Sequence, residues 1–422
     1  MVRYNPFRPS GLVSPGMFAG RYTELEATER ALLQTKHGNP HHFLVLGERG
    51  IGKSSLMLNV QWVSSGDISP FEGEKYKFLD VSIILEPSDS YADMIHRIGI
   101  EIKRQVAERE PLGEIAKNTW DFLKRWEVAG VKYDNHREEG KQSELLDDLL
   151  LTVERTLAHF GSRIDGIVIL IDEADKATSA THLGEFAKLF TERLVRRGCE
   201  RVCLGFAGLT TLLKTLRDSH ESSVRIFEIF SLEPLSRDER ITVIDNGLAK
   251  AKEQNGFETS ITSDAKSLIS HLSEGYPHFL QQFAYSAFDA DKDNSIDVDD
   301  VLDGAFDSDH GALKQLGVKY FQDLYFDKIG ADEYRAVLGA MAENFDNWVT
   351  KAEIRKKVQI KESTLNNAIS ALKKRHIIIP KPGSAGAYKL PNRSFAAWIR
   401  AFVRGKEEVG GPLPEAESSP KA

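Results

Sequence analysis

Eight residues near the start of the chain form the pattern best suited to chemistry. Residues 47–54 read Gly-Glu-Arg-Gly-Ile-Gly-Lys-Ser and fit G-x-x-x-x-G-K-[ST] at every fixed position. Glycines allow backbone N–H groups to turn toward phosphate oxygens, and a following helix directs its positive end at the same anion. The pattern predicts an ATP-binding phosphate loop made of Gly47, Glu48, Arg49, Gly50, Ile51, Gly52, Lys53, Ser54 and Ser55.

Two side chains of this loop have predicted roles. Lys53 would reach the β- and γ-phosphates and take part in catalysis, and the Ser54 hydroxyl would bind Mg²⁺. The apolar run at 43–46 and the helix-forming residues after 53 supply the strand and helix that the motif requires. A chance match in a glycine-rich turn is the alternative interpretation.

An acidic pair follows a second apolar run. Residues 167–171 are apolar throughout, as expected for a parallel strand that is buried on both faces, and Asp172 and Glu173 come at its carboxyl end. Asp172 would hold Mg²⁺ through water, and Glu173 would orient or deprotonate the attacking water. Two acidic residues that cap the next helix are the competing interpretation.

Strands and helices alternate around both motifs, which predicts an α/β fold with a doubly wound parallel sheet. Strands are predicted at 43–46, 76–85, 167–171, 201–207 and 227–232, and helices up to about 35 and at 53–63, 91–107 and 182–196.

The segment before the phosphate loop carries a family resemblance. Residues 17–25, Met-Phe-Ala-Gly-Arg-Tyr-Thr-Glu-Leu, resemble the N-terminal box of two ATPase groups, the replication-initiator branch of the AAA+ superfamily and the STAND signalling ATPases. The resemblance implies that Phe18, Gly20 and Arg21 lie beside the adenine of ATP. An ordinary helix start with a hydrophobic staple explains the segment equally well.

The same resemblance implies further site residues. Thr210, after strand 201–207, would sense the γ-phosphate, with a helix N-cap as its competing role. Arg225, with Arg217 second, would reach the γ-phosphate of the same or a neighbouring subunit, although a surface ion pair is the default for one arginine. Residues 275–277 resemble a Gly-x-Pro turn that brings a helical lid onto the adenine, which assigns Pro277 to the nucleotide. His278 stands where related proteins carry an arginine, which puts phosphate sensing in doubt there.

The domain organisation follows from these assignments. The expected parts are an ATPase core at 1–235 with an insertion at 108–141, an all-helical lid at 236–310, a winged-helix domain at 325–404 and a disordered tail at 405–422. The insertion would lie over the nucleotide site or contact a partner, or else fold locally around its own aromatic residues, which we favour slightly.

The winged-helix prediction comes from three short helices followed by a hairpin. Its second and third helices form a basic cluster in a chain of net charge −8, comprising Lys351, Arg355, Lys356, Lys357, Lys361, Lys373, Lys374 and Arg375. Such a surface predicts contact with double-stranded DNA. The alternative is a module that contacts its own nucleotide domain or a neighbouring subunit.

An acidic loop needs to be weighed separately. Residues 289–300 place acids at loop positions one, three, five, nine and twelve of a calcium-binding EF-hand, but the sixth position is Asn294 and the twelfth is Asp300. The favoured alternative is a polar loop that supplies the N-cap and acidic first turn of the next helix.

Composition limits the remaining classes. The chain has 422 residues, of which 41% are hydrophobic and 28% charged, and no apolar stretch approaches the roughly 20 residues of a membrane span. We therefore expect a cytoplasmic protein without a membrane partner. The leading hypothesis is an ATP-hydrolysing, DNA-associated switch of the initiator or loader type that forms a homo-oligomer or binds a partner protein. The rivals are a signalling or defence ATPase that oligomerises on ATP, and a nucleotide-binding scaffold without turnover, which Glu173 disfavours.

Overall fold

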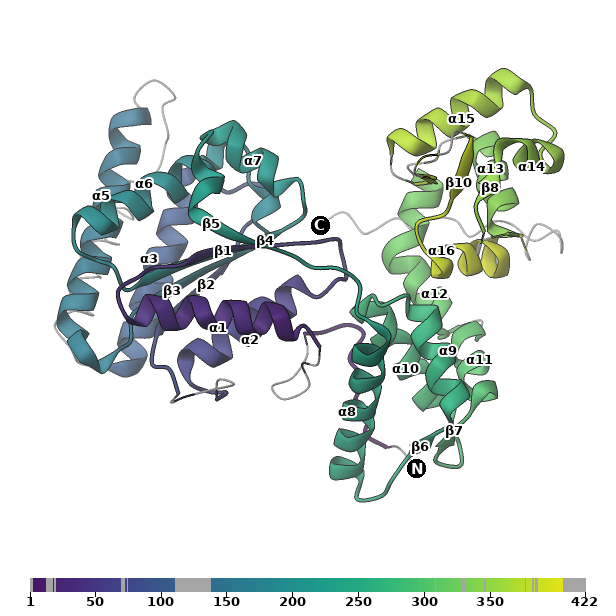
Figure 1. Ribbon diagram of the computed structural model, residues 1–422, viewed down its shortest axis with the longest axis horizontal. Helices are drawn as coiled ribbons and strands as arrows, with labels where there is room; N and C mark the ends of the chain where they lie inside the picture. Colours follow the sequence, from purple (N-terminus) through teal and green to yellow (C-terminus); the bar gives the residue numbers. More distant parts are fainter. Residues whose placement is uncertain are drawn as a thin grey trace. The chain divides into compact units, whose positions relative to one another are not determined.

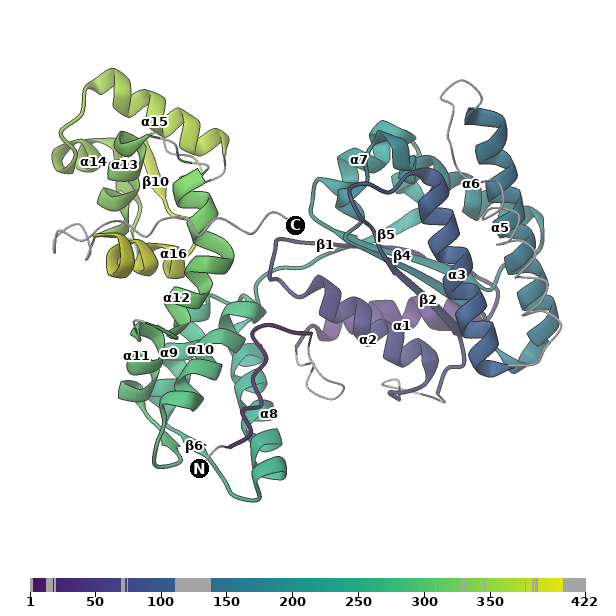
Figure 2. The same ribbon diagram turned by 180° about the vertical axis from the view of Figure 1, so that it is seen from behind.

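The chain folds into two compact units, Leu12–Glu233 and Met1–Gly11 with Pro234–Ala422. The computed structural model describes residues 3–12, 18, 20–69, 73, 75–110, 138–307, 309–327, 329, 331–344, 347–375, 377–381, 383 and 386–404. Figures 1 and 2 show the elements of each unit from opposite sides.

The first unit is built on a five-stranded sheet. Its strands are β1 (His42–Leu46), β2 (Leu79–Ile84), β3 (Ile167–Asp172), β4 (Val202–Gly208) and β5 (Phe227–Ser231). They lie in the order β2-β3-β4-β1-β5, and every pair is parallel. Only β4 separates β1 from β3. The carboxyl ends of the strands that lead into the two motifs are therefore close to each other.

Helices cover both faces of this sheet. The face of Leu44, Val81 and Ile169 packs against one group of helices, and α1 and α2 lie on the other face (Figure 1). Burial on both faces explains why these strands are almost uniformly apolar. The first group is α3 (Tyr91–Arg109), α5 (Glu138–Phe160), α6 (Leu183–Arg196) and α7 (Leu212–Ser219), and the other is α1 (Tyr22–Lys36) and α2 (Lys53–Ser65).

Helix α5 was not predicted from the sequence. Its leucines at 145, 146, 149 and 150 are buried at helical spacing against α3 and α6. The predicted insertion at 108–141 falls mainly on residues 111–137, which lie outside the described residues. The described residues at its two ends belong to the end of α3 and the start of α5.

The second unit starts with four helices, α8 (Arg237–Asn255), α9 (Ser263–Ser273), α10 (Pro277–Ala290) and α11 (Val298–Phe306). The prediction of a wholly helical segment needs one addition, because β6 (Ser260–Ile261) and β7 (Ser295–Ile296) form a short parallel pair. Strand β6 precedes α9 and β7 precedes α11, so their pairing links the two loops that lead into these helices.

A winged-helix module completes the unit. A three-stranded sheet of order β8-β10-β9 packs with its helices. The predicted fold class, a doubly wound P-loop core with a helical lid and a C-terminal winged helix, is therefore confirmed. The elements are α12 (Ala312–Leu316), α13 (Asp332–Ala342), β8 (Val349–Thr350), α14 (Lys351–Lys357), α15 (Glu362–Lys374), β9 (Ile379–Pro380), β10 (Ala387–Lys389) and α16 (Arg393–Trp398).

Residues 3–11 form an N-terminal strap on the helices of the second unit. The ring of Phe7 is buried, and a Cβ on Gly247 of α8 would lie 2.4 Å from it. The Asn255 side chain accepts from the Tyr4 N–H at 2.8 Å and donates to the Tyr4 carbonyl at 3.0 Å. These first residues were predicted to belong to the ATPase core at 1–235. The burial of Phe7 explains why they group with the helical unit instead.

Candidate functional site

The phosphate loop connects the end of β1 to the start of α2. Gly50 has φ 76° and Gly52 has φ 100°, left-handed conformations that favour glycine. Gly47 is required for space, because a Cβ there would lie 2.7 Å from Cγ2 of Ile51. The glycine pattern is thus matched to the backbone of a tight loop that ends at a helix amino terminus.

Lys53 points back over this loop. Its Nζ donates to the carbonyl oxygens of Gly47 at 2.9 Å and Glu48 at 2.8 Å. Burial lowers the pKa of Lys53, while the nearby carboxylates of Asp175 and Asp172 oppose that shift. The ammonium is therefore held by weak neutral acceptors at the position where phosphate oxygens would bind.

The two sequence motifs meet at the carboxyl edge of the sheet. The Ser54 hydroxyl lies near the carboxylate of Asp172, the last residue of β3. Burial raises the pKa of Asp172, whereas the nearby Ser54 hydroxyl and the Glu173 N–H, which donates to the carboxylate at 2.7 Å, stabilise its charged form. Two residues that are 118 positions apart in the sequence (172 − 54) thus lie close together, as the predicted Mg²⁺ role requires.

The donor set of this pair fits Mg²⁺. Across the described ranges, no group of three or more histidine, cysteine or carboxylate side chains could hold a metal by itself. Ser54 and Asp172 offer one hydroxyl and one carboxylate. Sparse protein ligation of this kind suits Mg²⁺, which keeps several waters and takes the remaining oxygens from phosphate groups.

Glu173 directly follows the metal-side carboxylate. It adopts a left-handed φ of 52°, which is uncommon for a residue with a side chain, and its carboxylate forms an ion pair with Lys176. Both side chains of the pair are part-exposed. To act as a base, the Glu173 carboxylate has to leave the ion pair with Lys176 and contact a water molecule instead. This costs little, because ion pairs between exposed side chains are weak.

The residues predicted to flank adenine lie in two places. The buried Arg21 guanidinium donates to the carbonyl oxygen of Ile51 at 3.0 Å, so that it supports the phosphate loop from behind. Phe18 and Gly20 line a cavity of about 190 Å³ together with Val60 and other residues of α1 and α2. Val60 lies about two turns along α2 from its first residue. The structure therefore brings Arg21, but not Phe18, to the loop.

Two other predicted site residues lie in different units of the fold. Thr210 is exposed in the turn after β4, between the two motif strands. The N-cap residue of α7 is Thr211, whose side chain makes no capping hydrogen bond. Pro277 begins α10 in the second unit, and its contact with nucleotide stays a prediction.

Arg225 lies at the other edge of the sheet from the phosphate loop. It is exposed just before Phe227, which pairs with His42 at the start of β1, whereas the loop follows the end of β1. The structure thus does not bring Arg225 to the site of its own chain. A role toward a neighbouring subunit stays a prediction.

His278 is unsuited to phosphate sensing. Burial lowers its pKa to about 4, with Lys319 adding to the shift, so the imidazole is neutral near pH 7. Its ring makes an edge contact with Tyr320 at a centroid distance of 5.0 Å. The doubt that the sequence raised about this position has a physical cause in its aromatic surroundings.

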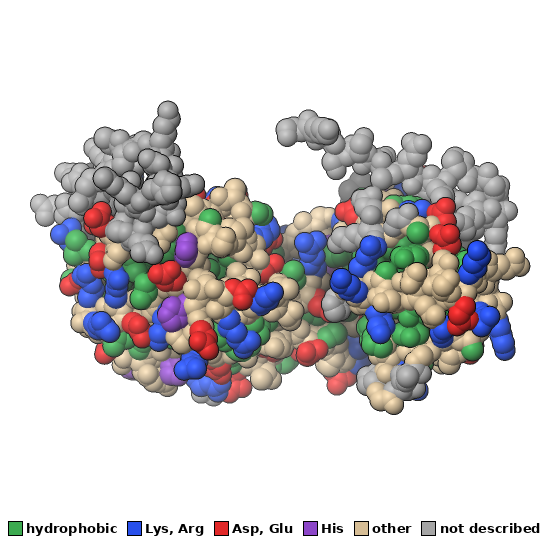
Figure 3. All heavy atoms as spheres, turned by 90° about the horizontal axis from the view of Figure 1, so that it is seen from above, with side chains coloured by type: hydrophobic (Ala, Val, Ile, Leu, Met, Phe, Trp, Pro, Cys, Tyr) green, Lys and Arg blue, Asp and Glu red, His purple; other side chains and the backbone are tan. Residues whose placement is uncertain are grey.

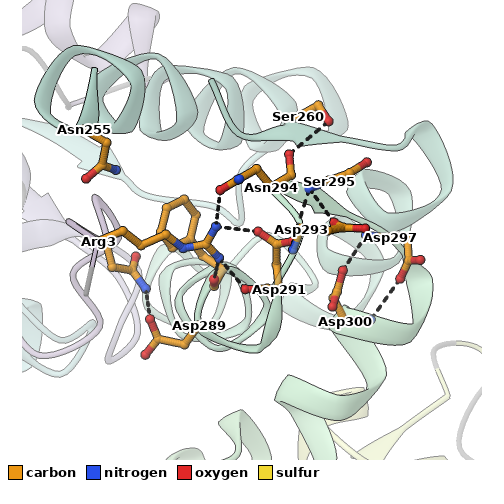
Figure 4. Close-up of polar contacts among 12 residues, drawn as sticks. Arg3, Asn255, Ser260, Asp289, Asp291, Asp293, Asn294, Ser295, Asp297 and Asp300 are labelled. Atoms are coloured by element: carbon orange, nitrogen blue, oxygen red, sulfur yellow. Dashed lines mark hydrogen bonds and ion pairs between the residues drawn. The ribbon is translucent and has the colours of Figure 1, made fainter. Parts of the chain in front are cut away.

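The acidic loop is organised around an arginine from the strap (Figure 4). Nη1 of Arg3 lies 2.6 Å from Oδ2 of Asp291 and donates to Oδ1 of Asn294 at 3.0 Å, and Nη2 donates to the Asp291 carbonyl at 2.8 Å. The guanidinium also lies 4.1 Å from the ring centre of Phe288. Asp297 caps α11, as the favoured interpretation of the sequence expected.

The predicted basic cluster is partly neutralised. Lys351 lies 2.6 Å from Glu362, Arg355 pairs with the same carboxylate, and Lys357 lies 2.6 Å from Glu343. Basic and acidic side chains are interspersed on the face seen in Figure 3.

In the part of the chain that the structure describes, no helix is both long and apolar enough to cross a bilayer.

Comparison with known proteins agrees with this geometry. Residues 17–197 match the protein family described as AAA ATPase domain. A relative is an uncharacterized HTH-type transcriptional regulator of Methanocaldococcus jannaschii, 25% identical over 285 residues, which are 65% of this chain and 64% of that protein. The aligned part thus spans slightly less than two thirds of the relative.

Two archaeal structures share the fold. The ORC2 protein of Aeropyrum pernix, solved as ADPNP-ADP complexes, has a TM-score of 0.56 and 14% identity, covering 96% of this chain and 99% of that one. The Walker-type ATPase PABY2304 of Pyrococcus abyssi has a TM-score of 0.50 and 16% identity, covering 91% and 96%. The predicted resemblance to an AAA ATPase is confirmed over residues 17–197, and the overall fold is shared with the ORC2 protein.

Proposed function

We propose that this protein binds and hydrolyses Mg·ATP at residues 47–55, Asp172 and Glu173. The proximity of the Ser54 hydroxyl to the Asp172 carboxylate carries the proposal, because it joins the two motifs where one metal-bound triphosphate would lie. The AAA ATPase match over 17–197 supports it, as does the fold shared with an ORC2 protein solved with adenine nucleotides.

Each residue has a distinct task in this proposal. The loop N–H groups and the amino end of α2 hold phosphate oxygens, and Lys53 exchanges the carbonyls of Gly47 and Glu48 for them. A Mg²⁺ ion held by Ser54 and Asp172 would neutralise charge on the phosphates. Glu173, released from Lys176, accepts a proton from the attacking water.

Steady-state hydrolysis with Glu173→Gln tests this assignment. We expect Mg²⁺-dependent turnover in the parent protein, at least about a hundred-fold less in the variant, and nucleotide affinity within a few-fold of the parent. Glu200→Gln, which changes an exposed carboxylate of the same unit, serves as the control and should keep full turnover. Parent-like turnover in Glu173→Gln would remove this residue from the mechanism.

We propose that the winged helix contacts double-stranded DNA through α15. Leu365, Ala368, Ile369 and Leu372 are buried, whereas the opposite face exposes amide, hydroxyl and ammonium groups. Such groups bond to base edges and phosphates. The name of the Methanocaldococcus relative, an HTH-type regulator, is consistent with this use. The exposed residues of α15 are Glu362, Ser363, Asn366, Asn367, Ser370, Lys373 and Lys374, and Glu362 already pairs with Lys351 and Arg355.

The rival function, an ATP-driven signalling switch that self-associates, draws support from the neutralised part of the cluster. Glu362 and Glu343 already balance Lys351, Arg355 and Lys357 within the module. A surface of mixed charge suits contact with protein better than contact with a polyanion. In this case the winged helix would contact its own chain or another copy.

Gel-shift titration with random duplex DNA separates the two functions. DNA contact predicts binding that weakens steeply with salt and is reduced at least about ten-fold in Lys373→Ala/Lys374→Ala. The paired Lys351 provides a control, since Lys351→Ala should have a smaller effect. No DNA binding, together with ATP-dependent growth in mass by light scattering, would favour the signalling switch.

A further inference from the structure

Asp175 connects the acidic motif to the neighbouring strand. It lies in a short turn, Ala174–Lys176, three residues after Asp172. Its Oδ1 accepts the backbone N–H of Leu209 at 2.9 Å, and Leu209 stands between the end of β4 and Thr210. The carboxylate therefore fixes the turn that carries the predicted γ-phosphate sensor.

The backbone is shaped to allow this contact. A Cβ on Gly208 would lie 2.8 Å from Oδ1 of Asp175 and 2.9 Å from its backbone nitrogen, so only glycine leaves room. The Gly208 carbonyl accepts the N–H of Gly47 at 3.3 Å. One short peptide thus touches the phosphate loop on one side and the acidic motif on the other.

The position of Asp175 places its charge close to the phosphate loop as well. Among the carboxylates that oppose the burial of the Lys53 ammonium, Asp175 has the largest effect, ahead of Asp172. The group that holds the β4 turn is therefore near the side chain expected to meet the β- and γ-phosphates.

We propose that Asp175 is a positioning residue that couples Thr210 to the nucleotide and sets how strongly the protein distinguishes ATP from ADP. The inference depends on the proposed nucleotide site. With the bond in place, Thr210 directly follows the residue whose N–H is bonded to the Asp175 carboxylate. Without it, the Leu209 N–H loses its partner, and a sub-ångström displacement of the turn is enough to weaken contacts to a γ-phosphate.

Nucleotide affinities of substituted proteins test the coupling. Dissociation constants are measured with Mg²⁺ for ADP and for a non-hydrolysable ATP analogue. We expect Asp175→Ala to shift their ratio about ten-fold toward ADP, the size of one lost hydrogen bond, with ADP affinity nearly unchanged. Asp175→Asn keeps an acceptor oxygen and should retain most of the parent ratio. Asp218→Ala, an exposed site on α7, is the control.

A double-mutant cycle shows whether Asp175 acts through Thr210. Thr210→Ala should shift the ratio as Asp175→Ala does, and the double variant should lose no more than either single one. Gly208→Ala, whose methyl group displaces the carboxylate, breaks the bond in a second way if Asp175→Ala fails to fold. Thermal unfolding checks that each variant is folded.

Three results would overturn the inference. These are equal losses of ADP and analogue affinity in Asp175→Ala, additive effects in the cycle, or an Asp175→Asn protein as impaired as Asp175→Ala. If the parent protein bound neither nucleotide, the proposed function itself would fail, and the inference with it.

Discussion

The phosphate loop and the acidic loop at 289–300 both match a ligand-binding pattern, but the chain treats their charges differently. Lys53 is bonded to neutral carbonyl oxygens of its own loop, which an anion can replace. Asp291 is paired with the strap residue Arg3 at 2.6 Å, and its side chain is fully buried. A motif indicates a ligand site where its charged group has no counter-charge from the chain and can be neutralised by a ligand. The same kind of motif has a structural role where another residue of the chain already supplies the counter-charge.

The two carboxylates Asp172 and Asp291 give the largest expected contrast. Asp172→Asn should lower ATP turnover at least about a hundred-fold, because the metal loses a charged ligand. Asp291→Asn should leave turnover per folded molecule within about two-fold of the parent. Hydrolysis assays at saturating Mg·ATP, with the folded fraction checked by circular dichroism, measure both. A turnover loss in Asp291→Asn as large as that in Asp172→Asn would break the comparison.

Stability should respond in the opposite way. Arg3→Ala leaves the Asp291 carboxylate buried without its partner, which we expect to destabilise the second unit by about 3 kcal/mol. Urea unfolding measures the change. Arg8→Ala, which removes an exposed arginine of the same strap, should cost less than about 1 kcal/mol. Equal losses of stability in the two variants would show that the stabilisation comes from the strap as a whole and not from the ion pair between Arg3 and Asp291.

The pH dependence sharpens the same point. Burial raises the pKa of Asp291, but Arg3 and the N–H groups of Asp293 and Ser295 outweigh it and hold the pKa below its ordinary value. A depressed acid pKa stabilises the fold above the unfolded pKa, and this contribution is lost as the pH falls through the folded pKa. The stability gap between parent and Arg3→Ala should therefore be full at pH 7 and shrink toward pH 3. A gap that is constant over this range would exclude the ionised pair as its source.

Calcium should have the smallest effect. Because Arg3 already neutralises Asp291, we expect millimolar Ca²⁺ to leave the thermal midpoint of the parent protein unchanged within about 1 °C. Mg²⁺ with ATP should raise the midpoint by several degrees. A Ca²⁺-induced rise as large as that from Mg·ATP would mean that the acidic loop is a metal site after all.

Sequence patterns predicted the sheet and the two motifs well because their signals are local. Apolar runs of strand length at 43–46 and 167–171 fix which residues reach the carboxyl edge, and parallel pairing brings the edges together. Helix α5 was missed although its buried leucines repeat at helical spacing. Only its first residues fall in the predicted insertion at 108–141, and no element was predicted for the residues between that insertion and strand 167–171.

The unpredicted contacts join residues that are far apart in sequence. Arg3 and Asp291 are 288 positions apart, and nothing in either segment alone shows that one meets the other. The bond from Leu209 to Asp175 likewise depends on which strand lies beside β3. Arg225 was assigned to the γ-phosphate through a resemblance. Only the register of β5 against β1 shows that β5 starts beside the start of β1, so that Arg225 lies at the edge of the sheet opposite to the phosphate loop.

One calorimetric titration tests the central claim most directly. A non-hydrolysable ATP analogue is titrated into the parent protein and into Lys53→Ala, with and without Mg²⁺, and Lys214→Ala serves as an exposed control on the same unit. We predict one site per chain in the parent and control, strengthened by Mg²⁺, and at least about a ten-fold loss of affinity in Lys53→Ala. Binding of equal strength in Lys53→Ala, or no binding in the parent, would contradict the account.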